Sequence, residues 1–497
     1  MYSLVHQRST IHILWVIITI AAVVVPTWLV HTRSASADSR TFHVDCQGND
    51  SASGTAPGSA WRSLEKANQA PLGPGDKLLF KRGCTWEGGL TANWRGASEE
   101  PIIIGAYGEG ILPQISGDRV AVSITGQYQI IEYLDVTAKK PQPYNGAVQC
   151  ADQPTGWRSG FAFNEGSQYN TVQHSRATGV VAGIHFSSGS HNRALYNELT
   201  NNNVMSRNTP NGGDDDSGAW GVLLNSDHNE VAYNTFSDNR ACSEDYGVEG
   251  ASIEVYRGSH NYIHHNTSVN DTTFTELGGT PSDQAENNIY AYNLYAPVNS
   301  PTGIFLVVRG ANSKWGGNPG TQFHNNTGYW VDIGISCGSG CNENILRAHN
   351  NIVWSRDDAR RGALFADAPF DERNNIFWKS DGNPRVQIEG GTRHETTITA
   401  DPLFVDAQAY DFRLRPGSPA IGAATNRTPG ELGINQDIIG VTVPLDVCAD
   451  VGAFEHDKTT NITEAIITNT DDALALAIDG EHMIYLPMIM RTAPCFQ

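Results

Sequence analysis

Pairs of apolar residues spaced two apart recur through the middle of the chain. In an extended strand, alternate side chains point to the same face, so both members of a pair enter one core while the residue between them faces outward. The pattern therefore predicts a series of short strands, each with one buried face. The pairs are Phe161/Phe163, Ile184/Phe186, Val222/Leu224, Ile253/Val255 and Ile304/Leu306.

An asparagine pattern follows these strands and repeats. The unit N-x-h-x-x-N, in which h is apolar, begins at Asn192, at Asn229 and again at Asn261. A unit that returns every 20–35 residues or so is typical of a solenoid, and strand-rich units favour a β-solenoid. Asparagine tolerates left-handed backbone and bonds neighbouring main chain, so one asparagine per coil can stack into a ladder.

These coils resemble the right-handed parallel β-helix of the pectin-lyase-like superfamily, over residues 41–455. The resemblance implies an all-β fold, a right-handed parallel β-helix with an N-terminal capping helix. It also implies a secreted carbohydrate-active protein. The reaction stays open, because this solenoid hosts hydrolases, lyases, esterases and adhesins.

The chain is expected to divide into four parts. Residues 11–30 are the only long apolar run, and Ala35-Ser-Ala37 follows, so residues 1–37 are interpreted as a secretory signal peptide. The run is long enough to span a bilayer, which leaves an uncleaved anchor as the alternative. Residues 38–118 would form the cap and the first coils, with a helix over residues 61–70. Residues 119–455 would form the β-helix with its active-face loops, and residues 456–497 a C-terminal tail.

Charge and cysteine content narrow the partners. A net charge of −20 and a pI near 5.1 argue against nonspecific nucleic-acid binding, which needs a basic surface. Eight cysteines fit an oxidising compartment, with Cys46–Cys84 and Cys337–Cys341 as the expected pairs. We expect a monomer that is secreted or held at the cell surface and acts on an extracellular polysaccharide. Membrane contact would come only through an uncleaved N-terminal segment.

Candidate chemistry comes from outward-facing positions. Between the core pairs these are Ala162, His185, Leu223, Glu254 and Phe305. Coils stack at roughly 4.8 Å, so His185 and Glu254 would lie about 10 Å apart on one face, on either side of Leu223. At the strand ends the corresponding series is Glu165, Ser188, Ser226, Arg257 and Arg309.

Acidic residues crowd the same coils. Glycoside hydrolysis needs two carboxyls, about 5–5.5 Å apart for retention or 6.5–9.5 Å for inversion, and adjacent coils offer such separations. The alternatives are an ordinary surface ion pair for Glu254 and a solvated acidic turn for Asp214–Asp216. The candidate catalytic residues are Glu254, Asp215, Asp216, Glu276, Glu249, His185 and Arg257.

Binding residues are expected around this group. Aromatic rings can stack on sugars, and arginine binds carboxylate or sulfate bidentately. No cofactor is required for hydrolysis, but Asp214 and Asp216 are candidate calcium ligands because calcium prefers oxygen. The expected substrate-binding residues are Arg309, Tyr256, Trp220, His265 and Tyr233.

The leading hypothesis is a secreted glycoside hydrolase in which Glu254 works with Glu276 or with a carboxylate of Asp214–Asp216. A calcium-assisted lyase on uronic-acid polymers is the alternative, since residues 249–279 faintly resemble coils of alginate and chondroitin lyases. Arg257 fits the first basic place of those coils, but Glu276 stands where the second would be, so the lyase machinery is incomplete. A non-catalytic glycan-binding or adhesion solenoid is the third reading.

Overall fold

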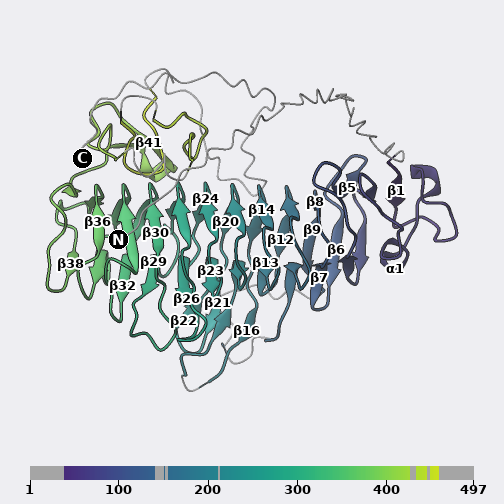
Figure 1. Cartoon of the computed structure of the whole chain (residues 1–497), viewed down its shortest axis with the longest axis horizontal. Helices are drawn as coiled ribbons and strands as arrows, with labels where there is room; N and C mark the ends of the chain where they lie inside the picture. The colour runs from purple at the N-terminus through teal and green to yellow at the C-terminus, as the bar shows by residue number, and fades with distance from the viewer. Residues whose placement is uncertain are drawn as a thin grey trace, which may run out of the picture. The chain divides into compact units, whose positions relative to one another are not determined.

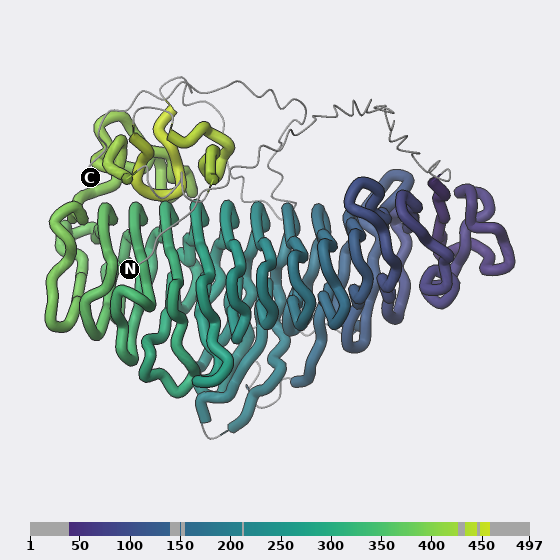
Figure 2. The backbone as a smooth tube through the Cα atoms, viewed as in Figure 1, coloured from purple at the N-terminus to yellow at the C-terminus, as the bar shows by residue number. Residues whose placement is uncertain are grey.

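Three sheets of parallel strands form the body of the protein (Figure 1). The computed structural model describes residues 39–139, 150, 155–210, 213–425, 433–444 and 448–457. Each coil contributes one strand to each sheet, and each strand pairs with its equivalent in the next coil. Figure 2 shows the coils following one another in chain order. The predicted all-β parallel β-helix is confirmed.

The strands of the three sheets are as follows. Sheet A holds β1 (Thr41–Val44), β2 (Lys77–Lys81), β5 (Ile102–Tyr107), β8 (Gln129–Glu132), β11 (Thr171–Gln173), β14 (Arg193–Leu195), β19 (Glu230–Ala232), β24 (Tyr262–His264), β27 (Ile289–Ala291), β30 (Thr321–His324), β33 (Leu346–His349) and β36 (Asp371–Arg373). Sheet B holds β3 (Thr85–Glu87), β6 (Gln114–Gly117), β9 (Asp135–Ala138), β12 (Arg176–Thr178), β15 (Glu198–Thr200), β20 (Thr235–Ser237), β25 (Thr267–Val269), β28 (Leu294–Ala296), β31 (Thr327–Val331), β34 (Ile352–Ser355), β37 (Ile376–Trp378) and β39 (Ile398–Thr399). Sheet C holds β4 (Leu90–Ala92), β7 (Val120–Ile124), β10 (Ser159–Phe163), β13 (Ala182–Phe186), β18 (Trp220–Leu224), β23 (Ala251–Tyr256), β26 (Thr273–Gly278), β29 (Ile304–Arg309), β32 (Ile333–Gly338), β35 (Gly362–Ala366) and β38 (Val386–Ile388).

The core lies between the three sheets and follows the predicted pairs, with one exception. Both members of each pair from Phe161/Phe163 to Ile253/Val255 are fully buried. In β29 the expected outward residue Phe305 is also fully buried, 5.7 Å from the ring of Phe274. The register pairs Glu276 with Val307, so Val307 takes the outward place. The prediction failed because the core pair of β29 is Leu306/Val308, two residues later than expected, and Ile304 is only partly buried. Phe305 takes the buried position before that pair, as Phe274 does in β26.

Ladders of asparagine run through the turns, as predicted. In one ladder Asn266 Oδ1 accepts hydrogen bonds from the backbone N–H and the side-chain amide of Asn234, both at 3.0 Å. The left-handed residue of each turn is the one before the asparagine, for example Tyr233 (φ 58°) and His265 (φ 55°). The asparagine therefore supplies hydrogen bonds rather than the left-handed backbone. The two longest ladders contain Asn170, Asn192, Asn229, Asn261 and Asn288, and Asn197, Asn234, Asn266, Asn293, Asn326, Asn351 and Asn375.

A short helix lies at the N-terminal end of the β-helix, and the C-terminal segment packs along the side of the coils (Figure 1). Near the N-terminus, α1 (Leu64–Ala67) is shorter than expected and is capped by Ser63, whose side chain accepts from the N–H of Lys66. Its apolar face is buried, as predicted. The last coil strand ends at Thr399, well before residue 455, because the chain then forms the antiparallel hairpin β40 (Phe404–Asp406) and β41 (Asp411–Leu414). This segment folds back on the coils, where Asn325 donates to the carbonyl of Asp450.

The expected signal peptide lies outside the described residues, and so does nearly all of the expected tail. In the described ranges, no helix is long and apolar enough to cross a membrane.

A third, shorter ladder ends in a buried acid and generates a stability prediction. Asn202 bonds to Asn239, and Asn239 donates to Asp271, which is fully buried and also accepts from Ser252. Burial raises the pKa of Asp271 to about 7, although hydrogen bonds from Ser252 and Asn239 oppose the rise. The unfolded value is about 3.9. The folded state therefore holds its proton more tightly, and this residue makes stability fall as pH rises from about 4 to 7.

Asp271→Asn keeps the ladder bonds and removes this penalty. We expect a higher melting temperature at pH 7, with a gain of up to about 4 kcal/mol, and little gain at pH 4. Thermal unfolding of both proteins across that range measures the difference. An equal gain at both pH values would show that the buried charge is not the cause.

Candidate active site

One line of outward-facing residues on sheet C carries the candidate chemistry. The register pairs His185 with Leu223, Leu223 with Glu254, and Glu254 with Glu276. The sequence analysis therefore placed these residues correctly: His185 and Glu254 are two coils apart, and Leu223 lies on the coil between them. Glu276 lies directly beside Glu254, at a coil spacing of roughly 4.8 Å. The structure thus brings two carboxyls together on adjacent strands.

Arg309 is the counter-ion of one of these carboxyls. Its guanidinium pairs with Glu276 Oε1 and donates to the carbonyl of Leu277. A side chain at Gly278 would begin 3.4 Å from the ring of Tyr256 and 3.6 Å from Arg309, so both extend across this glycine. In the stacked coils, Arg309 therefore occupies the position equivalent to Tyr256. The strand-end series predicted that it would occupy the position equivalent to Arg257. The series was out of step because the core pair of β29 is Leu306/Val308, so the residue equivalent to Arg257 is Gly310.

Glu254 has a different environment from Glu276. Within the described part of the chain it makes no hydrogen bond or ion pair. Burial raises the pKa of Glu254 well above its usual value, the charges of Glu276 and Glu249 raise it further, and Arg309 opposes them. Burial and like charge both favour the neutral acid. One carboxyl of the pair thus retains its proton while the other has an arginine beside it.

A hairpin brings a third carboxyl to the pair. Strands β21 (Ala241–Ser243) and β22 (Gly247–Glu249) pair antiparallel and lie beyond the coils, next to β16 (Met205–Arg207) (Figure 1). Burial raises the pKa of Glu249 well above its usual value, and the charges of Glu276, Asp216 and Asp245 raise it further. The hairpin also carries Tyr246, which the sequence analysis missed. The only signal for it was its place in an irregular stretch between two coils.

Comparison with known proteins identifies the architecture. No family model and no curated protein matches the sequence. Among solved structures, the pectate lyase Pel9A superposes with a TM-score of 0.54 at 16% identity, covering 85% of this chain and 97% of the lyase. The GH136 lacto-N-biosidase from Eubacterium ramulus gives 0.50 at 16% identity, covering 72% and 67%. The fold is a right-handed parallel β-helix, as in these proteins. At these identities the likeness shows the fold alone.

The acidic loop of this β-helix differs from the expected calcium site. Oxygens of Asp215, Asp216 and Asp245 lie within 4.8 Å of one another, whereas Asp214 pairs with Lys314 at 3.0 Å. Oxygen donors suit calcium. However, Asp245 Oδ2 accepts from the N–H groups of Asp215 and Asp216, and Asp216 Oδ2 accepts from Ser243 and from the N–H of Asp245. These carboxylates brace the loop against the β21–β22 hairpin.

The aromatic residues near the carboxyls, Trp220 and Trp157, lie on or beside the coils that precede Glu254 in the chain. Trp220 is only 7% exposed and packs with Leu223, so little of its ring can meet a ligand. Trp157, in a loop between coils, is half-buried and lies edge-on to His185 at 4.7 Å. Burial lowers the pKa of His185 to about 4, and its Nε2 lies 2.7 Å from Asn225 Oδ1. His185 is therefore neutral at pH 7.

Three other predicted residues lie apart from Glu254 and Glu276. The guanidinium of Arg257 is 4.9 Å from the ring centre of Tyr256 and 3.7 Å from Asp283. Tyr233 and His265 are in the turns that follow strands of sheet A, not on sheet C. There they belong to a row of stacked rings that contains Tyr133, His174, Tyr196, Tyr233, His265 and Tyr292. The repeat alone did not show which turn each of them occupies.

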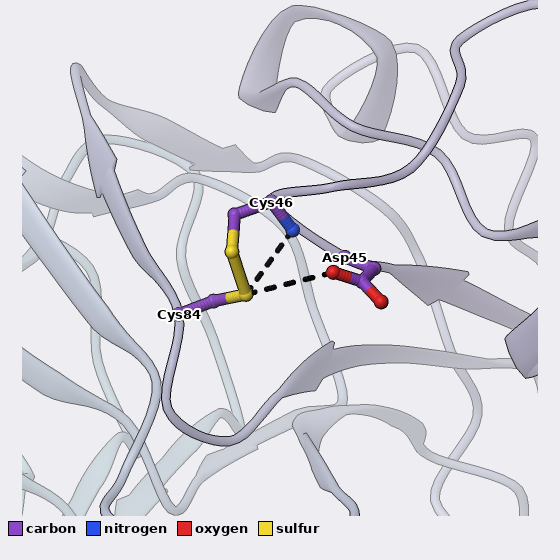
Figure 3. A group of neighbouring side chains, drawn as sticks. All are labelled: Asp45, Cys46 and Cys84. Atoms are coloured by element: carbon purple, nitrogen blue, oxygen red, sulfur yellow. Dashed lines mark hydrogen bonds between the residues drawn. A yellow bond between two sulfur atoms is a disulfide. The ribbon is translucent and has the colours of Figure 1, made fainter.

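Disulfides fix the cap and the loops. The expected pairs Cys46–Cys84 and Cys337–Cys341 are both present. A third bond, Cys150–Cys242, ties a loop to the β21–β22 hairpin. Figure 3 shows Asp45 beside Cys46 and Cys84. These sulfurs are bonded to each other, and Asp45 pairs with Lys81 at 2.7 Å, so this group is not a metal site.

The hydrogen bonds of the acidic loop generate a prediction about calcium. Burial would raise the pKa of Asp216, but hydrogen bonds from the N–H groups of Asp245 and Thr209 and from Ser243 outweigh it and lower the value. Because the loop braces itself, EDTA should leave the melting temperature unchanged, and Asp216→Asn should lower it by weakening charge-assisted bonds. Asp214→Asn, in an exposed position of the same loop, is the matched control. Calcium-dependent stabilisation of the native chain that Asp216→Asn abolishes would establish a calcium site instead.

Proposed function

We propose that this β-helix is a polysaccharide-degrading glycoside hydrolase with Glu254 as general acid and Glu276 as its partner carboxylate. The observation that carries the proposal is the contrast between these neighbours on adjacent strands. Glu254 is partly buried beside negative charge, whereas Glu276 is paired with Arg309. A carboxyl that favours its neutral form, next to one that is ion-paired with an arginine, has the properties of an acid beside a nucleophile or base.

The spacing favours retention of configuration. Adjacent strands lie roughly 4.8 Å apart, closer to the 5–5.5 Å of retaining enzymes than to the wider inverting range. In the first step Glu276 bonds to the anomeric carbon, the glycosidic C–O bond breaks, and the leaving oxygen takes the proton of Glu254. In the second step water attacks that carbon and gives its proton to Glu254, and the ester bond to Glu276 breaks. Arg309 holds the attacking carboxylate in place.

The wider setting supports a carbohydrate substrate outside the cytoplasm. The two similar structures are a pectate lyase and a lacto-N-biosidase, both proteins that cleave carbohydrate. The half-buried ring of Trp157 beside the line of sheet C residues is a surface on which a sugar can rest. Disulfide bonds are typical of extracellular proteins.

The alternatives give different products. A calcium-assisted lyase would form an unsaturated sugar that absorbs ultraviolet light and would lose activity in EDTA. A glycan-binding solenoid would release nothing. The lyase hypothesis needs Arg257 as one of its basic groups, but the guanidinium of Arg257 is stacked on the ring of Tyr256. A hydrolase releases reducing ends without the ultraviolet signal.

Substitution of the paired carboxyls tests the proposal. On a polysaccharide from a glycan panel, Glu254→Gln and Glu276→Gln should each lower kcat about 10³-fold, the range expected for loss of acid–base or nucleophilic groups. NMR of the first product should show the anomer of the substrate. Glu198→Gln, in a surface ion pair with Arg176 on sheet B, is the matched control and should keep full activity.

The pH profile gives an independent readout. Activity should fall at high pH as Glu254 loses its proton, because the acid form is required. Arg309→Ala should move this alkaline limb to higher pH, since the guanidinium lowers the pKa of Glu254. Normal cleavage by Glu254→Gln would refute the assignment.

A further inference from the structure

Two loops from opposite edges of sheet C meet through one ion pair. Asp214 lies in the loop that leads into β17 (Ser217–Gly218) and β18, and Lys314 lies in the loop that follows β29. Lys314 Nζ is 3.0 Å from Asp214 Oδ2, although the residues are 100 positions apart in sequence. One loop enters the strands and the other leaves them, so their contact has to pass over the outer face of the sheet.

The paired carboxyls lie on the strands between the two loops. The strand order of sheet C is β18, β23, β26, β29, which puts Glu254 on β23 and Glu276 on β26 between the two loops. Tyr246 lies at the tip of the β21–β22 hairpin. Burial raises the pKa of its hydroxyl, and the charges of Asp214, Glu249, Asp245 and Glu276 raise it further.

Both loops are braced up to the ion pair. The N–H of Gly279 donates to the carbonyl of Trp315 at 2.6 Å, and the N–H of Arg309 donates to Asn318 at 2.7 Å. Lys314 lies 5.1 Å from the ring centre of Trp315. On the other side, Asp245 accepts from the two N–H groups that follow Asp214. The Asp214 and Lys314 side chains are 58% and 68% exposed, so their contact is the part that can open.

We infer that the Asp214–Lys314 pair is a strap over the carboxyls, which makes the enzyme act from the ends of polysaccharide chains. The inference rests on the proposed function. A chain end can pass beneath the strap along the row of coils, whereas an internal segment has to displace it. The exposed pair makes internal cleavage rarer without forbidding it, because such a pair contributes little. Asp214 and Lys314 are thus specificity-determining residues and take no part in bond cleavage.

Product patterns test this inference in the full chain. The wild-type protein should release one small product, with little loss of viscosity for each reducing end formed. Lys314→Ala and Asp214→Ala should each raise internal cuts two- to fivefold, the range set by a surface ion pair of up to about 1 kcal/mol. Exchanging the charges, with Asp214→Lys and Lys314→Asp together, should restore the wild-type pattern. Lys379→Ala, in an exposed pair with Asp381 on another part of the coil, is the matched control.

A cross-linking experiment tests the strap without any activity. A carbodiimide activates the Asp214 carboxyl, and the Lys314 amine displaces the urea to form an amide with net loss of one water. Mass spectrometry of a digest should find the joined peptides in the wild-type chain and not in Lys314→Ala.

The outcomes separate the two proposals. Absence of the cross-link, a wild-type protein that cuts internally from the start, or identical patterns in wild-type and Lys314→Ala would each overturn the strap and leave the hydrolase proposal standing. Full activity in Glu254→Gln, with the cross-link present, would overturn the catalytic assignment while the contact remained.

Discussion

The stacking of each coil on the next, in register, is the constraint on which the rest of the molecule depends. Parallel strands pair through their backbones, and the ladder asparagines add a second set of bonds in the turns, where Asn266 binds both the N–H and the side chain of Asn234. A slip of one residue would turn every side chain of a strand to the opposite face and break the ladder at that coil. Register is therefore fixed twice, and the positions of outward side chains follow from it.

This rigidity allows unfavourable groups to be held together. Glu249, Glu254 and Glu276 repel one another and lose hydration, which the raised pKa values of Glu249 and Glu254 record. In a flexible loop such carboxyls would move apart. On adjacent strands Glu254 and Glu276 stay side by side, and Arg309 compensates the charge of Glu276. The stability of the hydrogen-bonded coils thus keeps mutually repelling carboxyls together at one place on the surface.

Much of the fold could be predicted from the sequence, because apolar period and asparagine spacing are local signals. The same signals placed Glu254 and His185 on one face. They failed at Phe305 and Arg309, because the continuous apolar run of β29 allows two phasings and its core pair is Leu306/Val308 rather than Ile304/Leu306. Contacts between loops were beyond reach, since nothing in the acidic loop indicates that Asp245 of a hairpin would join Asp215 and Asp216 while Asp214 turned to Lys314. Tyr233 and His265 were predicted beside the carboxyls but lie in the turns after sheet A, because the repeat pattern does not show which turn of a coil a residue occupies.

The pairing of Glu254 with Glu276 across one coil interface also makes the coil a unit of evolutionary change. Repeat proteins gain and lose whole units, each of which contacts only its neighbours. A copy of the β18 coil, whose outward residue is Leu223, inserted between β23 and β26 would preserve the stacking of the coils and yet double the separation of the two carboxyl-bearing positions. One duplication would then carry the site from the geometry of double displacement toward that of single displacement, and the stereochemistry of the product would change without a single substitution.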